Sequence, residues 1–346
     1  MSKKDLNVLN LKKFNLNNKT SLIYYNFKSY LEKCIKKKKY LVAVSGGPDS
    51  LALVVLSKIY SEEKKNKIFF VLVDHGIRSD SSKEAKDVKV LLKQKKINLI
   101  ILKNRKKIKK NIQSQARGVR YKLLLDFCNK NKIKFILTGH HREDQIETFL
   151  IRLSRGSGIQ GLSSMKKISS LNSKTELIRP FLDEKKQYLT ILAKQYFGKI
   201  FKDPSNTNQK YLRTKIRVLI KRFEKSGIKH DRIISSINNL GVTRDTLNTY
   251  ISKIEKNCVT KKKKKIVISL SSLSTESEEI KLKIISNCIT KISKNYYPPR
   301  AKKVLNLLNG IKLDKKIKST LGGCVIHKIQ NNLVIYKEEL KKGLKI

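Results

Sequence analysis

This sequence has no closely paired cysteines, no long apolar runs and few acidic residues. No apolar run approaches the roughly 18 residues of a membrane span, and the opening stretch, MSKKDLNVLNLKKFN, has no apolar signal segment. The cysteines form no CxxC pair and no cluster with metal-ligand spacing, which favours reduced thiols over a disulfide framework or a zinc site. They are Cys34, Cys128, Cys258, Cys288 and Cys324. The sequence therefore predicts a cytoplasmic protein with no membrane partner.

The shortage of acidic residues leaves a large positive charge. Asp and Glu number 27 against 79 Lys and Arg, so the formal net charge is +52. Drift in an AT-rich genome enriches Lys, Ile and Asn and explains part of the excess, but it does not explain why Asp and Glu are few. Clustered Lys and Arg attract phosphate backbones whatever their sequence. The charge therefore favours a polyanionic partner, for which a tRNA is the natural candidate.

Apolar runs of strand length alternate with helical patterns in the first half of the chain. Strands are expected at 40–45, 67–75, 97–103 and 133–139, and helices at 51–60, 82–95, 113–130 and 142–155. Such alternation predicts an α/β fold with a doubly wound parallel sheet. In that fold, ligands bind at the carboxyl ends of the strands, near the point where the strand order reverses.

The domain organisation is predicted as three segments. Residues 1–23 form a polar N-terminal extension, residues 24–210 the nucleotide-binding domain, and residues 211–346 a basic, mainly helical C-terminal region. A short basic helix is expected at 24–38. The run KKKKK at 261–265 is interpreted as a solvated turn or linker, with RNA contact as the alternative. Two strands, GGCVIHKI and LVIYKE, are expected to close the second domain.

The segment LVAVSGGPDS at 41–50 is the most informative part of the chain. It combines a buried strand, a glycine turn and the first turn of a helix, which together direct free N–H groups and a helix dipole at one point. This arrangement suits phosphate, and an acceptor-only carboxylate beside it suits Mg²⁺. An ordinary strand–turn–helix connection is the alternative. The residues expected to bind the nucleotide are Ser45, Gly46, Gly47, Pro48, Asp49 and Ser50.

Neither the P-loop ending Gly-Lys-Ser/Thr nor the GxGxxG fingerprint is present. The motif instead resembles the PP-loop, SGGxDS, of the ATP pyrophosphatase family, whose members cleave ATP to pyrophosphate and transfer AMP to an oxygen. The resemblance implies a PP-loop/HUP-like nucleotide-binding domain, ATP as a substrate, and Mg²⁺ held near Asp49, which is also expected to act in catalysis.

Segments further along resemble one branch of that family, the tRNA(Ile)-lysidine synthetases. The first is VDHGIRSDSSKEA at 73–85, and QSQARGVRY at 113–121 resembles the family's QAxARxxRY helix. His75, at a strand end, is expected to contact the nucleotide. Arg117 and Arg120 are three apart and share a helix face. A solvated basic face is the alternative, but the resemblance implies a catalytic role for Arg117 and tRNA contact for Arg120.

The most specific resemblance is GHHREDQIETFLIRLSRGSGIQGLSSM at 139–165, which matches the family pattern GHHxxDxxETxLxRLxRGSGxxGL. Asp144 and Glu147 share a helix face. The preceding His140 and His141 suggest a metal, but a metal site needs three or four convergent ligands. The resemblance implies that Asp144 and Glu147 bind the free lysine substrate, whose α-amino group needs carboxylate partners. Simple balancing of the many lysines is the alternative.

The last matching segments are RPFL at 179–182 and DPSNTNQKYLRTKIR at 203–217, which resemble the family's RPLL and DxSNxxxxYxRNxIR. Thr214 stands where the family usually has Asn. Arg213 and Arg217 share a helix face. The resemblance implies an essential arginine here, for which Arg213 is the first candidate, with Arg217 assigned to tRNA. Beyond residue 217 the resemblance is weak; in the family the C-terminal region helps to hold the tRNA, so the resemblance implies tRNA binding by residues 211–346.

The resemblance implies a ligase that joins free L-lysine to C2 of the wobble cytidine of tRNA(Ile) with a CAU anticodon, releasing AMP and pyrophosphate. A tRNA thiolase of the same superfamily would often carry CxxC, which is missing. A small-molecule amidating synthetase fits poorly with the charge, and a nonenzymatic RNA-binding protein fits poorly with the intact loop. The sequence leaves the oligomeric state open, with a homodimer as one candidate.

Overall fold

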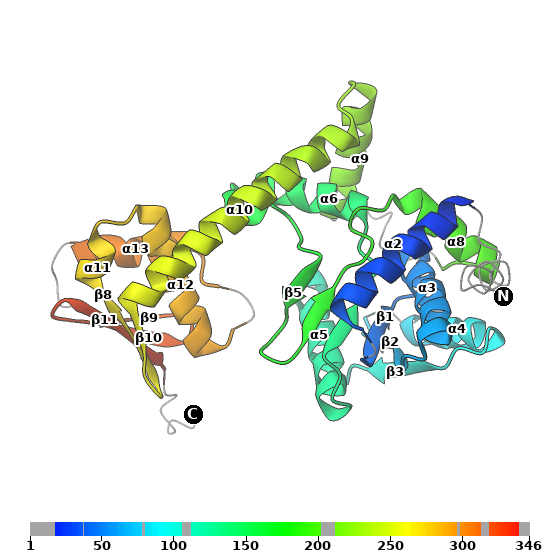
Figure 1. The fold of residues 1–346 in the computed structure, drawn as a ribbon, viewed down its shortest axis with the longest axis horizontal. Helices are drawn as coiled ribbons and strands as arrows, with labels where there is room; N and C mark the ends of the chain where they lie inside the picture. Colours follow the sequence, from blue (N-terminus) through cyan, green and yellow to red (C-terminus); the bar gives the residue numbers. More distant parts are fainter. Residues whose placement is uncertain are drawn as a thin grey trace. The chain divides into compact units, whose positions relative to one another are not determined.

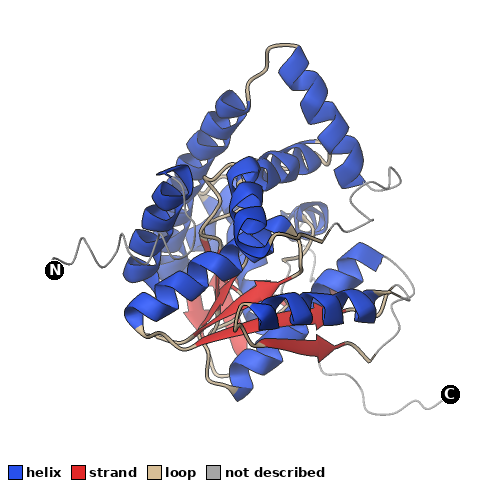
Figure 2. Cartoon of the chain, turned by 90° about the vertical axis from the view of Figure 1, so that its right-hand side faces the viewer, coloured by secondary structure: helices blue, strands red, loops and turns tan. Residues whose placement is uncertain are grey.

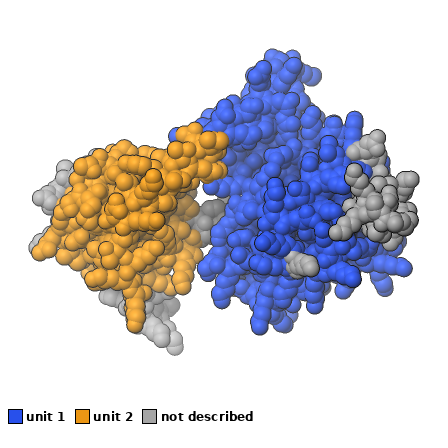
Figure 3. Space-filling view, in the orientation of Figure 1, with its two compact units in different colours: residues 1–240 blue, residues 241–346 orange. Residues whose placement is uncertain are grey.

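The computed structural model describes residues 18–36, 38–77, 80–105, 112–201, 212–295, 298–312 and 318–338. The chain divides into two compact units, residues 1–240 and 241–346 (Figure 3). The boundary predicted near residue 210 lies in 202–211, outside the described residues, so the predicted domain limits stay a prediction.

A six-stranded sheet forms the centre of the first unit (Figure 1). Its strand order is β3-β2-β1-β4-β6-β5, and every neighbouring pair is parallel except β5 with β6. The predicted doubly wound parallel sheet is confirmed. The strands are β1 (Tyr40–Val44), β2 (Ile68–Asp74), β3 (Leu99–Lys103), β4 (Phe135–Leu137), β5 (Ile168–Ser170) and β6 (Glu176–Ile178).

Helices cover both faces of this sheet because its strands are apolar on both sides. Tyr40 and Val42 belong to one buried cluster and Leu41 to another, as the alternation of side chains along a strand requires. The first cluster includes residues of α2 (Asn18–Cys34), α3 (Pro48–Lys64), α4 (Ser81–Gln94) and α8 (Lys186–Phe197), and the second includes residues of α5 (Ile112–Lys130).

The first described helix begins before its predicted start at residue 24. Helix α2 starts at Asn18, and Thr20 and Ile23 are buried, inside the stretch that was expected as a polar extension. Ile23 joins Tyr24 and Phe27 in the core cluster. Because this contact is with α3 and α8, which are distant in sequence, the local pattern of polar residues did not reveal it.

Three further helices follow β4 and bring distant segments together. They are α6 (Arg142–Leu153), the short α7 (Ile159–Leu162) inside the glycine-containing segment RGSGIQGLSS at 155–164, and α9 (Leu212–Lys225). Ile146 and Leu150 of α6 pack with Ile216 and Ile220 of α9 in a separate apolar cluster. This packing fixes which face of α9 is turned toward α6.

The second unit has its own antiparallel sheet with the order β7-β8-β11-β10-β9. The predicted pair of closing strands is present as β10 and β11, and three further strands complete the sheet. Strands and helices are coloured separately in Figure 2. The elements are α10 (His230–Cys258), which starts in the first unit, β7 (Val259–Lys261), β8 (Lys265–Ser269), α11 (Leu270–Ser274), α12 (Glu278–Ser293), α13 (Ala301–Lys312), β9 (Lys318–Leu321), β10 (Cys324–Ile329) and β11 (Asn332–Lys337).

One face of this second sheet is buried under helices. Ile266 and Ile268 of β8 and Ile326 of β10 form a core with Ile284 and Leu308 from α12 and α13. The lysine run at 261–265 includes the turn between β7 and β8, where the Lys262 N–H donates to the Lys265 carbonyl. Within the described ranges, no helix is both long and apolar enough to cross a membrane.

Candidate active site at the carboxyl ends of β1 and β4

The predicted phosphate loop lies between β1 and α3, where the strand order reverses between β1 and β4. Gly46 has φ +82°, and a Cβ there would lie 2.7 Å from Val88 Cγ2, so the position requires glycine. Gly47 is the extended N-cap of α3, and Pro48 follows at the helix start. The loop therefore leaves backbone N–H groups at the N-terminus of α3 for an anion.

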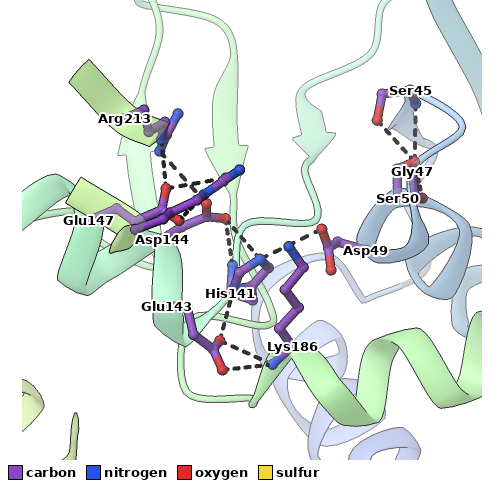
Figure 4. Close-up of polar contacts among 11 residues, drawn as sticks. Ser45, Gly47, Asp49, Ser50, His141, Glu143, Asp144, Glu147, Lys186 and Arg213 are labelled. Atoms are coloured by element: carbon purple, nitrogen blue, oxygen red, sulfur yellow. Dashed lines mark hydrogen bonds and ion pairs between the residues drawn. The ribbon is translucent and has the colours of Figure 1, made fainter. Parts of the chain in front are cut away.

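Two serines hold the shape of this loop (Figure 4). The Ser45 N–H and the Ser45 hydroxyl each donate to Ser50 Oγ at 3.1 Å. Ser50 Oγ in turn donates to the Gly47 carbonyl at 2.9 Å. Since these bonds close the loop on itself, the serines first serve to set the backbone conformation that phosphate would meet.

Asp49 lies in the first turn of α3 and faces the end of β4. A Cβ on Gly139 would come within 2.7 Å of the Asp49 carbonyl oxygen, so glycine permits the close approach of the two backbones. Asp49 Oδ1 is buried and accepts no hydrogen bond in the described structure. No group of three or more metal-binding side chains occurs among the described residues. A lone carboxylate oxygen beside a phosphate loop fits Mg²⁺ carried by a nucleotide, which takes one or two carboxylates and phosphate oxygens.

His141 is the N-cap of α6 and is 2% exposed. Its Nδ1 lies 3.0 Å from Glu143 Oε2, and its Nε2 lies 3.6 Å from Asp49 Oδ2 and 3.5 Å from Asp144 Oδ2. Burial opposes protonation, but the contacts with Asp49 and Glu143 and the charge of Asp144 raise the pKa of His141 to about 10. The side chain is therefore an imidazolium among three carboxylates.

The neighbouring His140 behaves in the opposite way. Its Nδ1 lies 2.9 Å from Thr138 Oγ1. Burial, together with the charges of Arg179, Arg117 and Arg213, lowers the pKa of His140 to about 3, although Asp144 opposes the shift. His140 is therefore neutral at physiological pH, and adjacent histidines carry different charges because they face different partners.

The predicted acidic pair meets the predicted C-terminal arginines. Arg213 Nε donates to Glu147 Oε2 at 2.8 Å, and Arg217 Nε donates to Glu147 Oε1 at 2.6 Å. Glu147 is 4% exposed. Arg213 Nη2 also lies 3.6 Å from Asp144 Oδ1. Burial favours the neutral acid, but the charges of His141 and Arg213 hold the pKa of Asp144 below its usual value. Arg217, assigned to tRNA from the sequence, thus contacts Glu147 in this structure.

The two arginines of α5 lie near the carboxyl ends of β4 and β2. The Arg117 guanidinium is 5.1 Å from the Tyr121 ring centre, and its charge reaches His140 after β4. Burial and the charge of Arg120 lower the pKa of His75 to about 4, against a smaller opposing effect of Asp74. His75, Arg117 and Arg120 are therefore grouped around the same edge of the sheet as the phosphate loop.

Comparison with known proteins agrees with this geometry. A family model described as a PP-loop domain matches residues 19–223. The tRNA(Ile)-lysidine synthase of Wolbachia pipientis wMel is 36% identical over 302 residues, which cover 86% of this chain and 70% of that protein. The protein of that name from Orientia tsutsugamushi (strain Boryong) is 34% identical over 314 residues, covering 87% and 70%. This chain belongs to the tRNA(Ile)-lysidine synthase family. The family resemblance inferred from the motifs is confirmed.

A solved structure supports the fold of this family member. The U34-tRNA thiolase NcsA from Methanococcus maripaludis, described with its [4Fe-4S] cluster, aligns with a TM-score of 0.52 over 64% of this chain and 80% of that one. At 18% identity, the likeness shows the fold alone. The thiolase alternative gains no support from the cysteines, since Cys128 is buried and burial raises the pKa of its thiol to about 12.

Sequence reasoning gave no role to two residues that organise the lysidine synthase site. His141 was noticed only as part of a histidine pair, and Glu143 was not singled out. Glu143 accepts from the Lys186 N–H at the start of α8, at 3.0 Å and 3.2 Å, and so joins α8 to His141. The available signal was position, because both residues open a helix that follows a strand end.

Proposed function

We propose that this protein joins L-lysine to C2 of the wobble cytidine in tRNA(Ile) with a CAU anticodon. The C2 oxygen attacks the α-phosphate of ATP and pyrophosphate leaves; the lysine ε-amine then attacks C2 and AMP leaves with that oxygen. The observation that carries the proposal is the Asp144–Glu147 pair placed beside the PP-loop in a member of this family. Simple ATP hydrolysis would not need a second acidic site.

In the first step, the loop of residues 45–50 binds the departing pyrophosphate through its N–H groups and the N-terminus of α3. Asp49 Oδ1, which is free of hydrogen bonds, is the oxygen suited to hold Mg²⁺. Mg²⁺ would neutralise charge on the leaving phosphates. Arg117 and His75 are assigned to the nucleotide, and Arg117 supplies positive charge as the phosphoryl group is transferred.

In the second step, Asp144 and Glu147 bind the lysine α-ammonium. Both oxygens of Glu147 already accept hydrogen bonds from Arg213 and Arg217, so lysine competes with these arginines for the carboxylates. The arginines have an alternative partner in substrate phosphates. The ε-amine must be neutral to attack, and its reference pKa is about 10.4, so partial desolvation in the pocket is required.

The tRNA is assigned to the basic surface of the chain. A net charge of +52 gives strong phosphate attraction, and a base in a single-stranded anticodon loop can leave its stack to enter a pocket. Arg120 and the second unit are assigned to tRNA contact. A cytoplasmic location belongs to the same proposal, and the candidate homodimer stays a prediction that the molecular mass in solution would test.

A lysine-incorporation assay tests the function. Purified protein, a tRNA(Ile) transcript with a CAU anticodon, ATP, Mg²⁺ and labelled lysine should yield lysine attached to RNA. Incorporation should require ATP and should disappear when the wobble cytidine is replaced by uridine or when Asp49→Ala is introduced. Pyrophosphate release without lysine attachment would keep the ATP chemistry and refute the nucleophile. Binding of tRNA without either reaction would favour the nonenzymatic alternative.

A further inference from the structure

We propose that His141 is a positioning residue that ties the phosphate loop to the acidic pair, an inference that rests on the proposed function. The His141 side chain contacts both Asp49 and Asp144. Its Nε2 lies 3.6 Å from Asp49 Oδ2 and 3.5 Å from Asp144 Oδ2 (Figure 4). A single N–H group thus lies between the carboxylate of the ATP site and the carboxylate of the lysine site.

The imidazole ring is itself fixed from its other side. Nδ1 donates to Glu143 Oε2 at 3.0 Å, and Glu143 accepts from the Lys186 N–H at the start of α8. The ring is also held by burial, since His141 is only 2% exposed. The ring is fixed at Nδ1, and its Nε2 is shared by Asp49 and Asp144. The position of the ring therefore determines where these two carboxylates lie.

This arrangement decides which oxygens remain for the substrates. Asp49 uses Oδ2 toward His141, while its Oδ1 is buried without a hydrogen bond. Asp144 Oδ2 contacts the His141 ring at Nε2 and accepts a hydrogen bond from the His141 backbone N–H. Asp144 Oδ1 instead faces Arg213 at 3.6 Å. In each carboxylate, His141 holds one oxygen and leaves the other for the reacting partners.

Positioning matters because the two reaction steps use the same cytidine. The cytidine must be adenylated at the phosphate loop and then attacked by lysine bound at the acidic pair. An error in the distance between the two half-sites therefore affects both steps. A displacement of about 1 Å in a catalytic arrangement can cost roughly 10²-fold in rate. His141 touches neither reacting atom in this scheme and acts through Asp49 and Asp144.

Two substitutions separate this role from a purely structural one. His141→Asn keeps an N-cap side chain for α6 and an amide N–H near the place of Nδ1, but it is too short to reach Asp49. His141→Gln places its amide N–H near the place of Nε2 and loses the Glu143 contact. Both remove the positive charge, so the loss of charge cancels in the comparison. His327→Asn on β10 is a control for histidine loss outside the site.

The experiment measures direct binding and reaction rates for the full chain. For His141→Asn we expect at least about tenfold weaker binding of a non-hydrolysable ATP analogue and of lysine, and roughly 10²-fold slower tRNA-dependent pyrophosphate release. For His141→Gln we expect all three values within about tenfold of the unmodified chain. Thermal unfolding monitored by circular dichroism verifies that each variant is folded.

The opposite order overturns the proposal. If His141→Asn behaves like the unmodified chain and His141→Gln is impaired, His141 serves only as a helix cap. If His141→Asn weakens ATP analogue binding or lysine binding but not both, it does not tie the two half-sites. The binding measurements need no tRNA product, so they remain decisive if lysine incorporation fails and the proposed function is wrong. If one variant does not fold, the other still decides: unchanged binding of both ligands by His141→Asn refutes the role, and so does more than about tenfold weaker binding of both ligands by His141→Gln.

Discussion

At the scale of single residues, Glu147 shows how the site balances burial against charge. The carboxylate is 4% exposed and accepts hydrogen bonds from two arginines. Removing one partner of a buried charge pair leaves the other charge uncompensated. Here the side chains of Arg213 and Arg217 are 39% and 30% exposed. Water therefore solvates the guanidinium groups when the carboxylate charge is removed, and the destabilisation is smaller than for a fully buried pair.

Glu147→Gln is therefore expected to reduce the free energy of unfolding by only about 1–2 kcal/mol. Its effect on lysine should be larger, since a neutral amide does not compensate an ammonium, and we expect the KM for lysine to rise at least about tenfold. Urea denaturation and steady-state kinetics measure the two effects. Asp126→Asn, an exposed change on α5, should alter neither. An unchanged lysine KM in Glu147→Gln would remove Glu147 from the lysine site.

His75 gives a prediction for the effect of pH on stability. Burial and Arg120 lower the pKa of His75 from 6.5 to about 4. Between these values the unfolded chain binds a proton that the folded chain does not, so this group makes the free energy of unfolding rise with pH across pH 4 to 6.5. Above pH 6.5 the contribution is complete, and it is lost as the pH falls through the folded pKa.

The test is denaturation at several pH values in that window. His75→Asn cannot titrate, so its stability should depend less steeply on pH than that of the unmodified chain. His327→Asn on β10 is the matched control for the loss of a histidine outside the site. Equal slopes for the unmodified chain and His75→Asn would show that His75 is not protected from protonation in the folded protein.

At the scale of elements, the strand–loop–helix unit of β1 and α3 depends on one glycine. Gly46→Ala places a Cβ at φ +82° and 2.7 Å from Val88, so the loop must shift. Backbone strain of this kind costs about 1–3 kcal/mol. We expect a loss of stability in that range and at least about tenfold weaker ATP binding, because in the proposed function the loop supplies the N–H groups for phosphate.

Gly118→Ala is the matched control for this change. Gly118 lies in α5, where an added Cβ meets no atom within 4 Å. Alanine is a better helix former than glycine, so this variant should be more stable by up to about 1 kcal/mol. Isothermal titration with ATP and thermal unfolding measure both variants. Equal ATP affinity in Gly46→Ala and Gly118→Ala would show that the conformation of residues 45–50 does not control nucleotide binding.

The elements also show how far the sequence could predict the structure. The parallel strands and the phosphate loop were predictable because apolar runs and a glycine turn are local signals. The salt bridges from Arg213 and Arg217 to Glu147 were not, because they depend on α9 packing against α6 through Ile216 and Ile220. The role of His141 depends on the close approach of Gly139 to Asp49, which no spacing in the sequence encodes.

At the scale of the whole molecule, charge determines how a tRNA would be bound. The chain carries 79 Lys and Arg against 27 Asp and Glu, and phosphate contacts release counterions from the RNA. Affinity for tRNA should therefore fall steeply with salt, by at least about tenfold between about 50 and 200 mM. Binding of an ATP analogue, which involves few phosphates and a preformed loop, should fall much less.

Filter binding with a tRNA(Ile) transcript and titration with the ATP analogue measure the two dependences in the same buffers. A transcript with a changed wobble base should show the same salt slope, because phosphate contacts do not depend on the base. Discrimination against that transcript should instead appear in the reaction step, where under the proposed function the cytidine enters the site beside the phosphate loop. A salt-independent tRNA affinity would mean that the excess of lysine reflects genome composition rather than an RNA-binding surface.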